Sequence, residues 1–188
     1  ANTAITCDNG TVGITAVTIS HVLNGVDVYK DTEALEMNIT GLTITDYDGV
    51  GLAVWAENQT LDLQMTDCVL SGLPDSVGVS TTSADEATGA SIIMMDNVTI
   101  TGGLNAVDLL AMTDLDLTLT DCKFYEQYET AVVAEAVYGS SNVVMDGTLI
   151  DGTDAFDSST IYTVDADEAY EFQMIEPEAG NRTYYGGS

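Results

Sequence analysis

The chain has 188 residues, 45% of them hydrophobic, and its 31 acidic against three basic side chains give a formal net charge of -28. This length and hydrophobic content allow one domain with a substantial core. A surface this negative repels nucleic acid and anionic lipid, so we expect neither as a partner, and no apolar run is long enough for membrane insertion. The charge could instead attract cations or a basic partner, or reflect adaptation to high salt.

A seven-residue motif recurs six times along the chain. Its first, fourth and sixth positions are almost always apolar, and the positions between them are mostly polar or small. Alternation with a period of two predicts strands, and no sustained period of 3.6 residues predicts helices. One copy is too small to bury its own apolar face, so we expect the copies to stack around a shared core. The copies are ITAVTIS (14–20), ITGLTIT (39–45), MTDCVLS (65–71), MDNVTIT (95–101), LTDCKFY (119–125) and MDGTLID (145–151).

Further strands are predicted on both sides of the motif. A strand leads into several copies, as at Leu35, Met37 and Ile39. After the motif and a turn, a second apolar pair is predicted to face inward. These pairs are Val26 and Val28, Val77 and Val79, Val107 and Leu109, and Ala131 and Val133, with Val50 and Leu52 displaced by one residue.

The sequence therefore predicts an all-β, single-stranded parallel β-helix, a solenoid of about six to seven rungs of roughly 25 residues each. We expect one domain over residues 1–188, with rungs over about 10–176 and an exposed tail at 177–188. The seventh rung is placed through Tyr170, Phe172 and Met174.

This repeat pattern resembles the right-handed parallel β-helix family, which includes pectate-lyase-like enzymes and bacterial autotransporter passengers. The resemblance implies that lyase members use a basic residue, often near calcium, for which only Lys30, Lys123 and Arg182 are available. It also implies Asp clusters with Gly-His-Gly and Arg-Ile-Lys motifs in galacturonase-like members, and the chain lacks both motifs. No catalytic residues are therefore carried over, and we do not expect an enzyme.

Cys68 and Cys122 occupy the fourth motif position two rungs apart, with Val98 between them. Rungs about 4.8 Å apart would separate their Cα atoms by about 9.6 Å. A disulfide needs less than about 7 Å, so we predict two buried free thiols. Cys7 is placed outside this ladder.

Several side chains are candidates for binding or modification. Asp67 with Asp121, and Asp96 with Asp146, share columns, where a structural role at repeated bends is favoured over catalysis. Tyrosines that could stack on sugars gather late in the sequence, from Tyr125 onward. Turn carboxylates that could bind Ca²⁺, the one cofactor considered, are Asp46, Asp48, Asp151, Asp154 and Asp157. Sequons for glycosylation lie at Asn38, Asn58, Asn97 and Asn181.

We therefore expect an extracellular or cell-surface structural protein. It would assemble with itself through its end rungs into a fibre, sheath or surface layer, or act as an adhesin-like passenger. A start at Ala1 instead of Met fits export with processing, or a piece of a longer chain. The alternative is a carbohydrate-binding or polysaccharide-degrading β-helix protein, with glycans as partners.

Overall fold

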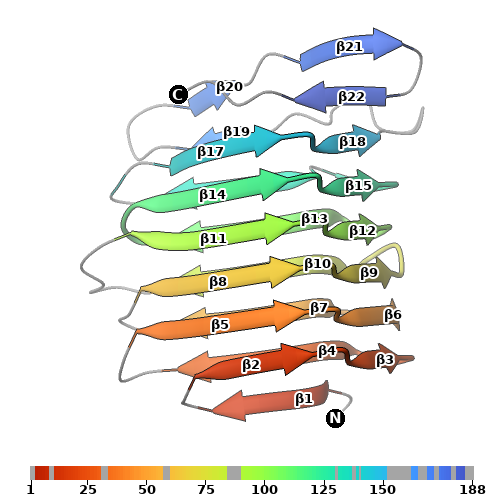
Figure 1. Cartoon of the computed structure of the whole chain (residues 1–188), viewed down its shortest axis with the longest axis vertical. Coiled ribbons are helices and arrows are strands. Elements are labelled where there is room, and N and C mark those ends of the chain that lie inside the picture. Colours follow the sequence, from red (N-terminus) through yellow and green to blue (C-terminus); the bar gives the residue numbers. More distant parts are fainter. Residues whose placement is uncertain are drawn as a thin grey trace.

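The computed structural model describes residues 3–8, 11–30, 34–56, 60–83, 90–129, 131–136, 139, 141–151, 162–164, 169–171, 174–178 and 181–184, with side chains up to residue 150. The regular structure of these residues is entirely β, in three sheets that stack along one axis (Figure 1). The described residues contain no helix long and apolar enough to cross a membrane.

Each sheet takes one strand from every turn of the chain. Sheet A contains β1 (Thr3–Asp8), β4 (Asn24–Lys30), β7 (Val50–Ala56), β10 (Val77–Ser83), β13 (Asn105–Ala111), β16 (Val132–Ala136), β19 (Tyr162–Val164) and β20 (Ala169–Glu171). Sheet B contains β2 (Val12–Thr15), β5 (Leu35–Thr40), β8 (Leu61–Thr66), β11 (Ser91–Asp96), β14 (Leu115–Thr120) and β17 (Ser141–Asp146). Sheet C contains β3 (Thr18–Ser20), β6 (Thr43–Tyr47), β9 (Val69–Gly72), β12 (Thr99–Thr101), β15 (Lys123–Tyr125), β18 (Leu149–Asp151), β22 (Asn181–Tyr184) and β21 (Met174–Glu178).

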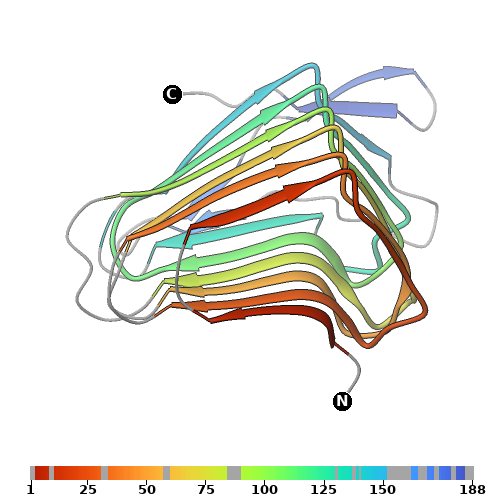
Figure 2. The same ribbon diagram turned by 60° about the horizontal axis from the view of Figure 1, so that its bottom comes forward.

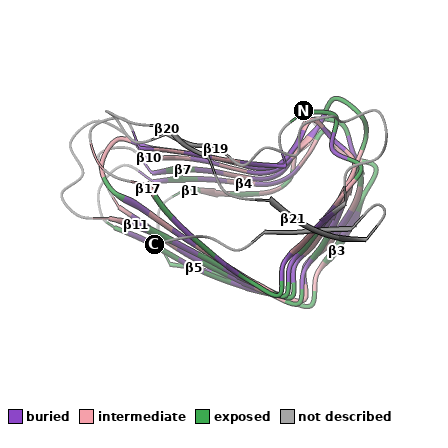
Figure 3. Cartoon of the chain, turned by 90° about the horizontal axis from the view of Figure 1, so that it is seen from above, coloured by how far each residue is buried: buried purple, intermediate pink, exposed green. Residues whose placement is uncertain are grey.

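The chain winds through sheets B, C and A in that order, which makes a parallel β-solenoid, as the repeat predicted. About five turns of roughly 26 residues run from β2–β3–β4 to β14–β15–β16, and β17, β18 and β19 then continue the three sheets in parallel. Seen along the axis, the three sheets enclose one interior (Figure 3). The predicted number of six to seven rungs was therefore slightly off.

The parallel pattern ends after β19. There β20 pairs antiparallel with β19, and β22 pairs antiparallel with both β18 and β21. Tyr170 and Met174 thus lie on strands β20 and β21 and not on one parallel rung, and Phe172 lies outside the described residues. Alternation has the same period in parallel and antiparallel strands, so it could not distinguish them. Part of the predicted exposed tail, Asn181–Tyr184, forms β22.

The motif columns form the core. The first and sixth positions are buried in all six copies, and the fourth is buried in all but Val17. Three members of the fourth column are small donors that bond to backbone carbonyls of their own and the neighbouring turn. Cys122 Sγ lies 3.4 Å from the carbonyls of Met95 and Thr120, and Thr148 Oγ1 lies 3.2 Å from that of Leu119.

The cysteines are confirmed as free, and Cys68 and Cys122 are fully buried. Burial raises the pKa of Cys68, and it raises that of Cys122 to about 11. Cys7 lies outside the ladder of Cys68 and Cys122, as predicted: it is in β1, in register with Val28 of sheet A, and packs half-buried against the core. Strand β1 precedes the first motif copy, so the repeat did not predict that Cys7 would lie in sheet A.

The corner between sheets B and C is built the same way in every turn. The third motif position has a positive φ in all six copies, between 50° and 66°. Such backbone disfavours most side chains but is tolerated by glycine, asparagine and aspartate. This explains five of the six residues there, Gly41, Asp67, Asn97, Asp121 and Gly147, whereas Ala16 is the exception. The structural reading of Asp67 and Asp121 is thereby supported.

Sheet A differs from sheet B because its strands bend (Figure 2). Strands β4, β7 and β10 each have two consecutive buried residues, whereas β5 alternates strictly between buried and exposed. The first of the two is always small. A Cβ atom at Gly51 would lie 2.7 Å from both the Gly78 carbonyl oxygen and Leu70 Cδ2 of sheet C. The small column comprises Gly25, Gly51, Gly78, Ala106 and Ala131.

The bend also corrects the predicted apolar pairs. The buried residues in register are Val26, Leu52, Val79, Val107 and Val132, followed two positions later by Val28, Val54, Thr81, Leu109 and Ala134. Val77 and Val133 are only partly buried. The connection from the sixth motif position to this column varies from seven to nine residues. A fixed spacing therefore displaced the assignment in three turns.

Candidate functional site

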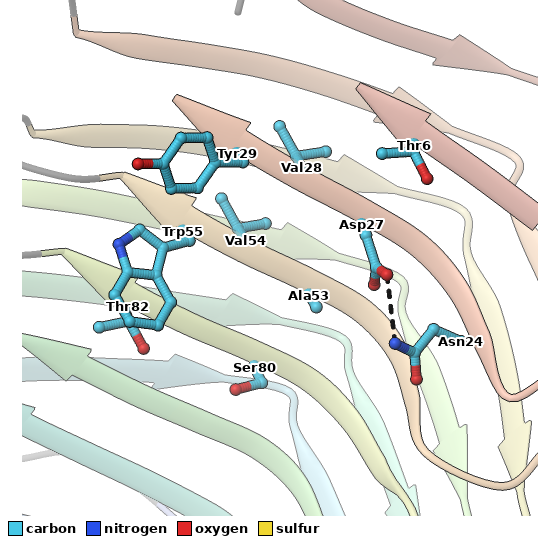
Figure 4. A pocket seen from close by; sticks show the side chains of 10 residues that line it. All are labelled: Thr6, Asn24, Asp27, Val28, Tyr29, Ala53, Val54, Trp55, Ser80 and Thr82. Carbon is cyan, nitrogen blue, oxygen red and sulfur yellow. Dashed lines mark hydrogen bonds between the residues drawn. The ribbon is translucent and has the colours of Figure 1, made fainter. Parts of the chain in front are cut away.

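The outer side of the bend in sheet A is hollowed into a groove of about 420 Å³. This volume lies within the range of small-ligand sites, roughly 300–1,000 Å³. The sheet A groove, as we call it, spans four neighbouring strands, β1, β4, β7 and β10 (Figure 4). It is lined by Thr6, Asn24, Asp27, Val28, Tyr29, Ala53, Val54, Trp55, Ser80 and Thr82.

Two aromatic rings stand side by side on this face. Tyr29 and Trp55 are partners in register on β4 and β7, so their Cα atoms are one strand spacing apart, about 4.8 Å. Tyr29 is 39% exposed and Trp55 is 50% exposed. Thr82 follows them in register on β10. The rings form an apolar strip that runs across the strands, along the solenoid axis (Figure 4).

Beside the rings lies a hydrogen-bonded carboxylate. Asp27 Oδ2 accepts bonds from Thr3 Oγ1 at 2.8 Å and from Asn24 Nδ2 at 3.2 Å. Asn24 is itself held, because its Oδ1 accepts a bond from the backbone N–H of Val50 at 3.1 Å. The other carboxylate oxygen, Asp27 Oδ1, is buried without a hydrogen-bond partner. The side chain is thus fixed at one oxygen and unsatisfied at the other.

The outer face of sheet A continues past the groove with further carboxylates. Asp108 on β13 follows Ser80 in register, and Glu135 lies on the next strand, β16, beside Leu110. Burial raises the pKa of Asp108, and the negative charge of Glu135 raises it further. The described lysines do not lie on this outer face. Lys30, the last residue of β4, is buried on the inner side of sheet A, and Lys123 is exposed on β15 of sheet C. This face is therefore acidic.

A second hollow, of about 200 Å³, lies on the outer face of sheet B. It is lined by Gln64, Met65, Thr66, Met94, Met95, Asp96, Thr118 and Thr120. It has no aromatic ring and one carboxylate. Apolar, hydroxyl and anionic groups converge better in the sheet A groove.

The candidate calcium ligands are not brought together in the described part of the chain. Asp46 and Asp48 are both exposed near the end of β6, and Asp46 Oδ2 lies 3.5 Å from His21 Nε2 of the preceding turn. Residues with described side chains include no group of three or more His, Cys, Asp or Glu arranged for a metal ion. The backbone of Asp151 belongs to β18, and Asp154 and Asp157 lie outside the described residues.

The sequons lie in different surroundings. Asn38 is exposed on β5, on the outer face of sheet B. Asn97 is also exposed, but its Nδ2 atom, the one that would carry a glycan, donates a hydrogen bond to Asp67 Oδ1 at 2.6 Å. The backbone of Asn181 belongs to β22, and Asn58 lies outside the described residues.

Sequence reasoning missed the aromatic pair. Only the tyrosines from Tyr125 onward were considered as sugar contacts, whereas Tyr29 and Trp55 occur early in the chain, 26 positions apart. The available signal was their shared place in the repeat, one residue after a buried valine and one before the end of a strand. An outward aromatic in two consecutive turns predicts an exposed ladder.

The fold and the groove define a class of protein, an acidic parallel β-solenoid with an aromatic groove on one outer face. Comparisons of the chain with protein-family models, with curated proteins and with solved structures found no match.

Proposed function

We propose that the protein is a carbohydrate-binding β-solenoid that holds a glycan chain in the sheet A groove, as an extracellular or cell-surface protein. The observation that carries this proposal is the half-exposed ladder of Tyr29 and Trp55 beside polar side chains. Sugar rings have apolar faces and hydroxyl edges. Aromatic rings contact the faces, and groups such as Asn24, Ser80 and Thr82 can bond to the hydroxyls.

The ladder also explains how a chain-like ligand would lie. Tyr29, Trp55 and Thr82 follow one another across the strands, so successive sugars would lie along the solenoid axis. An added peptide strand is a poorer fit, because β4, β7 and β10 are each paired on both sides and offer no free edge. The proposal is binding without catalysis, which agrees with the lack of the family motifs.

Trp55 is the only tryptophan in the chain, so its fluorescence reports directly on the groove. We expect cello- or chito-oligosaccharides to change its emission saturably. In calorimetric titrations, Trp55→Ala should weaken binding by about tenfold or more, equivalent to about 1.4 kcal/mol. Tyr128→Ala is the matched control, because Tyr128 is an exposed aromatic outside the groove, and this variant should bind normally. Lack of binding to any neutral or charged oligosaccharide would refute the proposal.

A second candidate function is end-to-end self-assembly into a fibre or sheath of the passenger or surface-protein type. It is favoured by one observation: β1, β2 and β3 are the end strands of their sheets, and inward Ile5 and Cys7 are only partly covered there. Unpaired strand edges favour association. The net charge opposes it, so rods should lengthen as salt screens repulsion. Electron microscopy across a salt series tests this, and isolated particles at every salt concentration would refute it.

A further inference from the structure

The ring-bearing row of the sheet A groove is straight, which restricts the shape of a ligand. Tyr29 on β4, Trp55 on β7 and Thr82 on β10 are partners in register on neighbouring parallel strands, and all three line the groove. Neighbouring strands are about 4.8 Å apart, so the three residues follow one another at this spacing along the solenoid axis. A ligand that contacts all three must therefore run straight across three turns.

A second row of outward residues lies beside the first on the same three strands. It comprises Asp27, Ala53 and Ser80, and it also lines the groove. Ala53 has the smallest side chain of the three, so it fills little of the groove beside Trp55, whose ring is half-exposed. The central turn of the groove is therefore apolar and open, with polar side chains on the turns before and after it.

Glycan chains differ in whether they can follow a straight row. In a β-1,4-linked glucan or chitin-type chain, the bonds leave each ring equatorially at opposite ends, so the chain is a flat ribbon that advances by about one ring length for each sugar. Successive rings turn over, but both faces carry apolar C–H groups. An α-1,4-linked chain has an axial bond at each sugar and curls. One ring length is close to the strand spacing, so only the ribbon keeps in step with the row.

We propose that the sheet A groove, if it binds glycans as proposed above, selects extended β-1,4-linked chains, with one sugar on each of three turns and the central sugar stacked on Trp55. The number of sugars follows from where the groove ends. Leu110 on β13 and Asp8 on β1 continue the row in register, but neither lines the groove. Affinity should therefore rise from one sugar to three and then level off.

The first test compares three neutral trisaccharides by calorimetric titration of the wild-type protein. Cellotriose and the N-acetylglucosamine trimer are β-1,4-linked, and maltotriose is the α-1,4-linked isomer of cellotriose. At least one of the two β-linked trisaccharides should bind about tenfold or more tightly than maltotriose. The same titrations with the β-linked dimer and tetramer measure where the gain with chain length stops.

Two variants of β10 test the row itself. Thr82→Tyr adds a third ring in line with Tyr29 and Trp55, and it should tighten trisaccharide binding by about three- to tenfold. Ser80→Tyr adds the same ring on the same strand and face, but in the second row, and it should not tighten binding. Both positions face outward and are only partly buried, so both variants should remain folded by circular dichroism.

The outcomes separate this inference from the function on which it rests. Maltotriose that binds as tightly as both β-linked trisaccharides would overturn the inference and leave glycan binding intact. So would a Ser80→Tyr variant that gains as much affinity as Thr82→Tyr. A gain that continues undiminished beyond three sugars would overturn the assignment of one sugar to each of three turns. Lack of binding to these and all other oligosaccharides would overturn both proposals.

Discussion

Sheets A and B are built from the same turns, with parallel strands in the same order, yet only sheet A has an aromatic groove. The strands of sheet B alternate strictly, so the sheet has one buried and one exposed face. Those of sheet A contain a small residue that lets the backbone approach sheet C closely. The bend that results hollows the outer face. The column of small side chains is thus the feature that distinguishes sheet A, with its candidate binding face, from sheet B.

The largest effect should come from breaking the alternation of sheet B. Ile93→Asp places an unpaired charge in the core, at a position with no exposed surface. It should cost about 4 kcal/mol or more, enough to unfold most domains. The adjacent control, Ile92→Asp, changes a side chain that is 41% exposed and should remain folded by circular dichroism. Equal behaviour of the two variants would contradict the alternation of buried and exposed residues, and reversed behaviour would show the opposite register.

The bend of sheet A is tested by Gly51→Val. The new Cβ would meet the Gly78 carbonyl oxygen and Leu70, so strands must shift, at a cost of about 1–3 kcal/mol. Gly13→Val is the control in sheet B, where a Cβ would have no atom within 4 Å, and it should change little. Urea unfolding of both variants measures the difference. A Gly51→Val variant as stable as wild type would mean that the bend does not require a small residue.

The corner between sheets B and C offers a smaller, opposite effect. Ala16 has a φ of 52°, where its Cβ is strained, so Ala16→Gly should stabilise the protein by about 0.5 kcal/mol or more. The same substitution at Ala53, within strand β7, should destabilise by about 0.5–1 kcal/mol because glycine gains more freedom on unfolding. Thermal unfolding that moves both variants in the same direction would contradict the left-handed corner.

The outer face of sheet A should give the smallest effect, and it depends on pH. The pKa of Asp108 is raised in the folded protein, so the folded state holds this proton more tightly than the unfolded state does. Stability is therefore lost as pH rises from the ordinary aspartate pKa through the raised one. Asp108→Asn should be more stable than wild type at neutral pH and equal to it in strong acid. Asp116→Asn on the outer face of sheet B, where Asp116 accepts a hydrogen bond from Asn142, should show no such gain.

Much of the solenoid could be predicted because the repeat reports the stacking directly. The first and sixth motif positions, from Ile14 to Ile150, are buried as the alternation indicated. The partners of Val26 were harder to assign, because the preceding connection varies in length and a strand pattern shifted by two residues looks the same. The antiparallel pairing of β20 could not be predicted, because parallel and antiparallel strands have the same two-residue alternation.

The groove could be predicted only in part. The positions of Tyr29 and Trp55 in the repeat would have placed both rings outward and adjacent. The hollow itself depends on how far sheet A bends, and the unsatisfied oxygen of Asp27 depends on bonds from Thr3 and Asn24 across separate strands. Long-range contacts of this kind have no local pattern in the sequence.

The uneven connection between sheets C and A has a consequence for how such a chain changes over generations. Because this corner already takes seven to nine residues without disturbing either neighbouring ladder, a codon gained or lost there alters one bend only. A codon gained inside β8 or β11 would instead reverse the faces of every side chain that follows it in the strand. Indels should therefore collect at this corner, which also makes it the natural place to splice in a foreign loop.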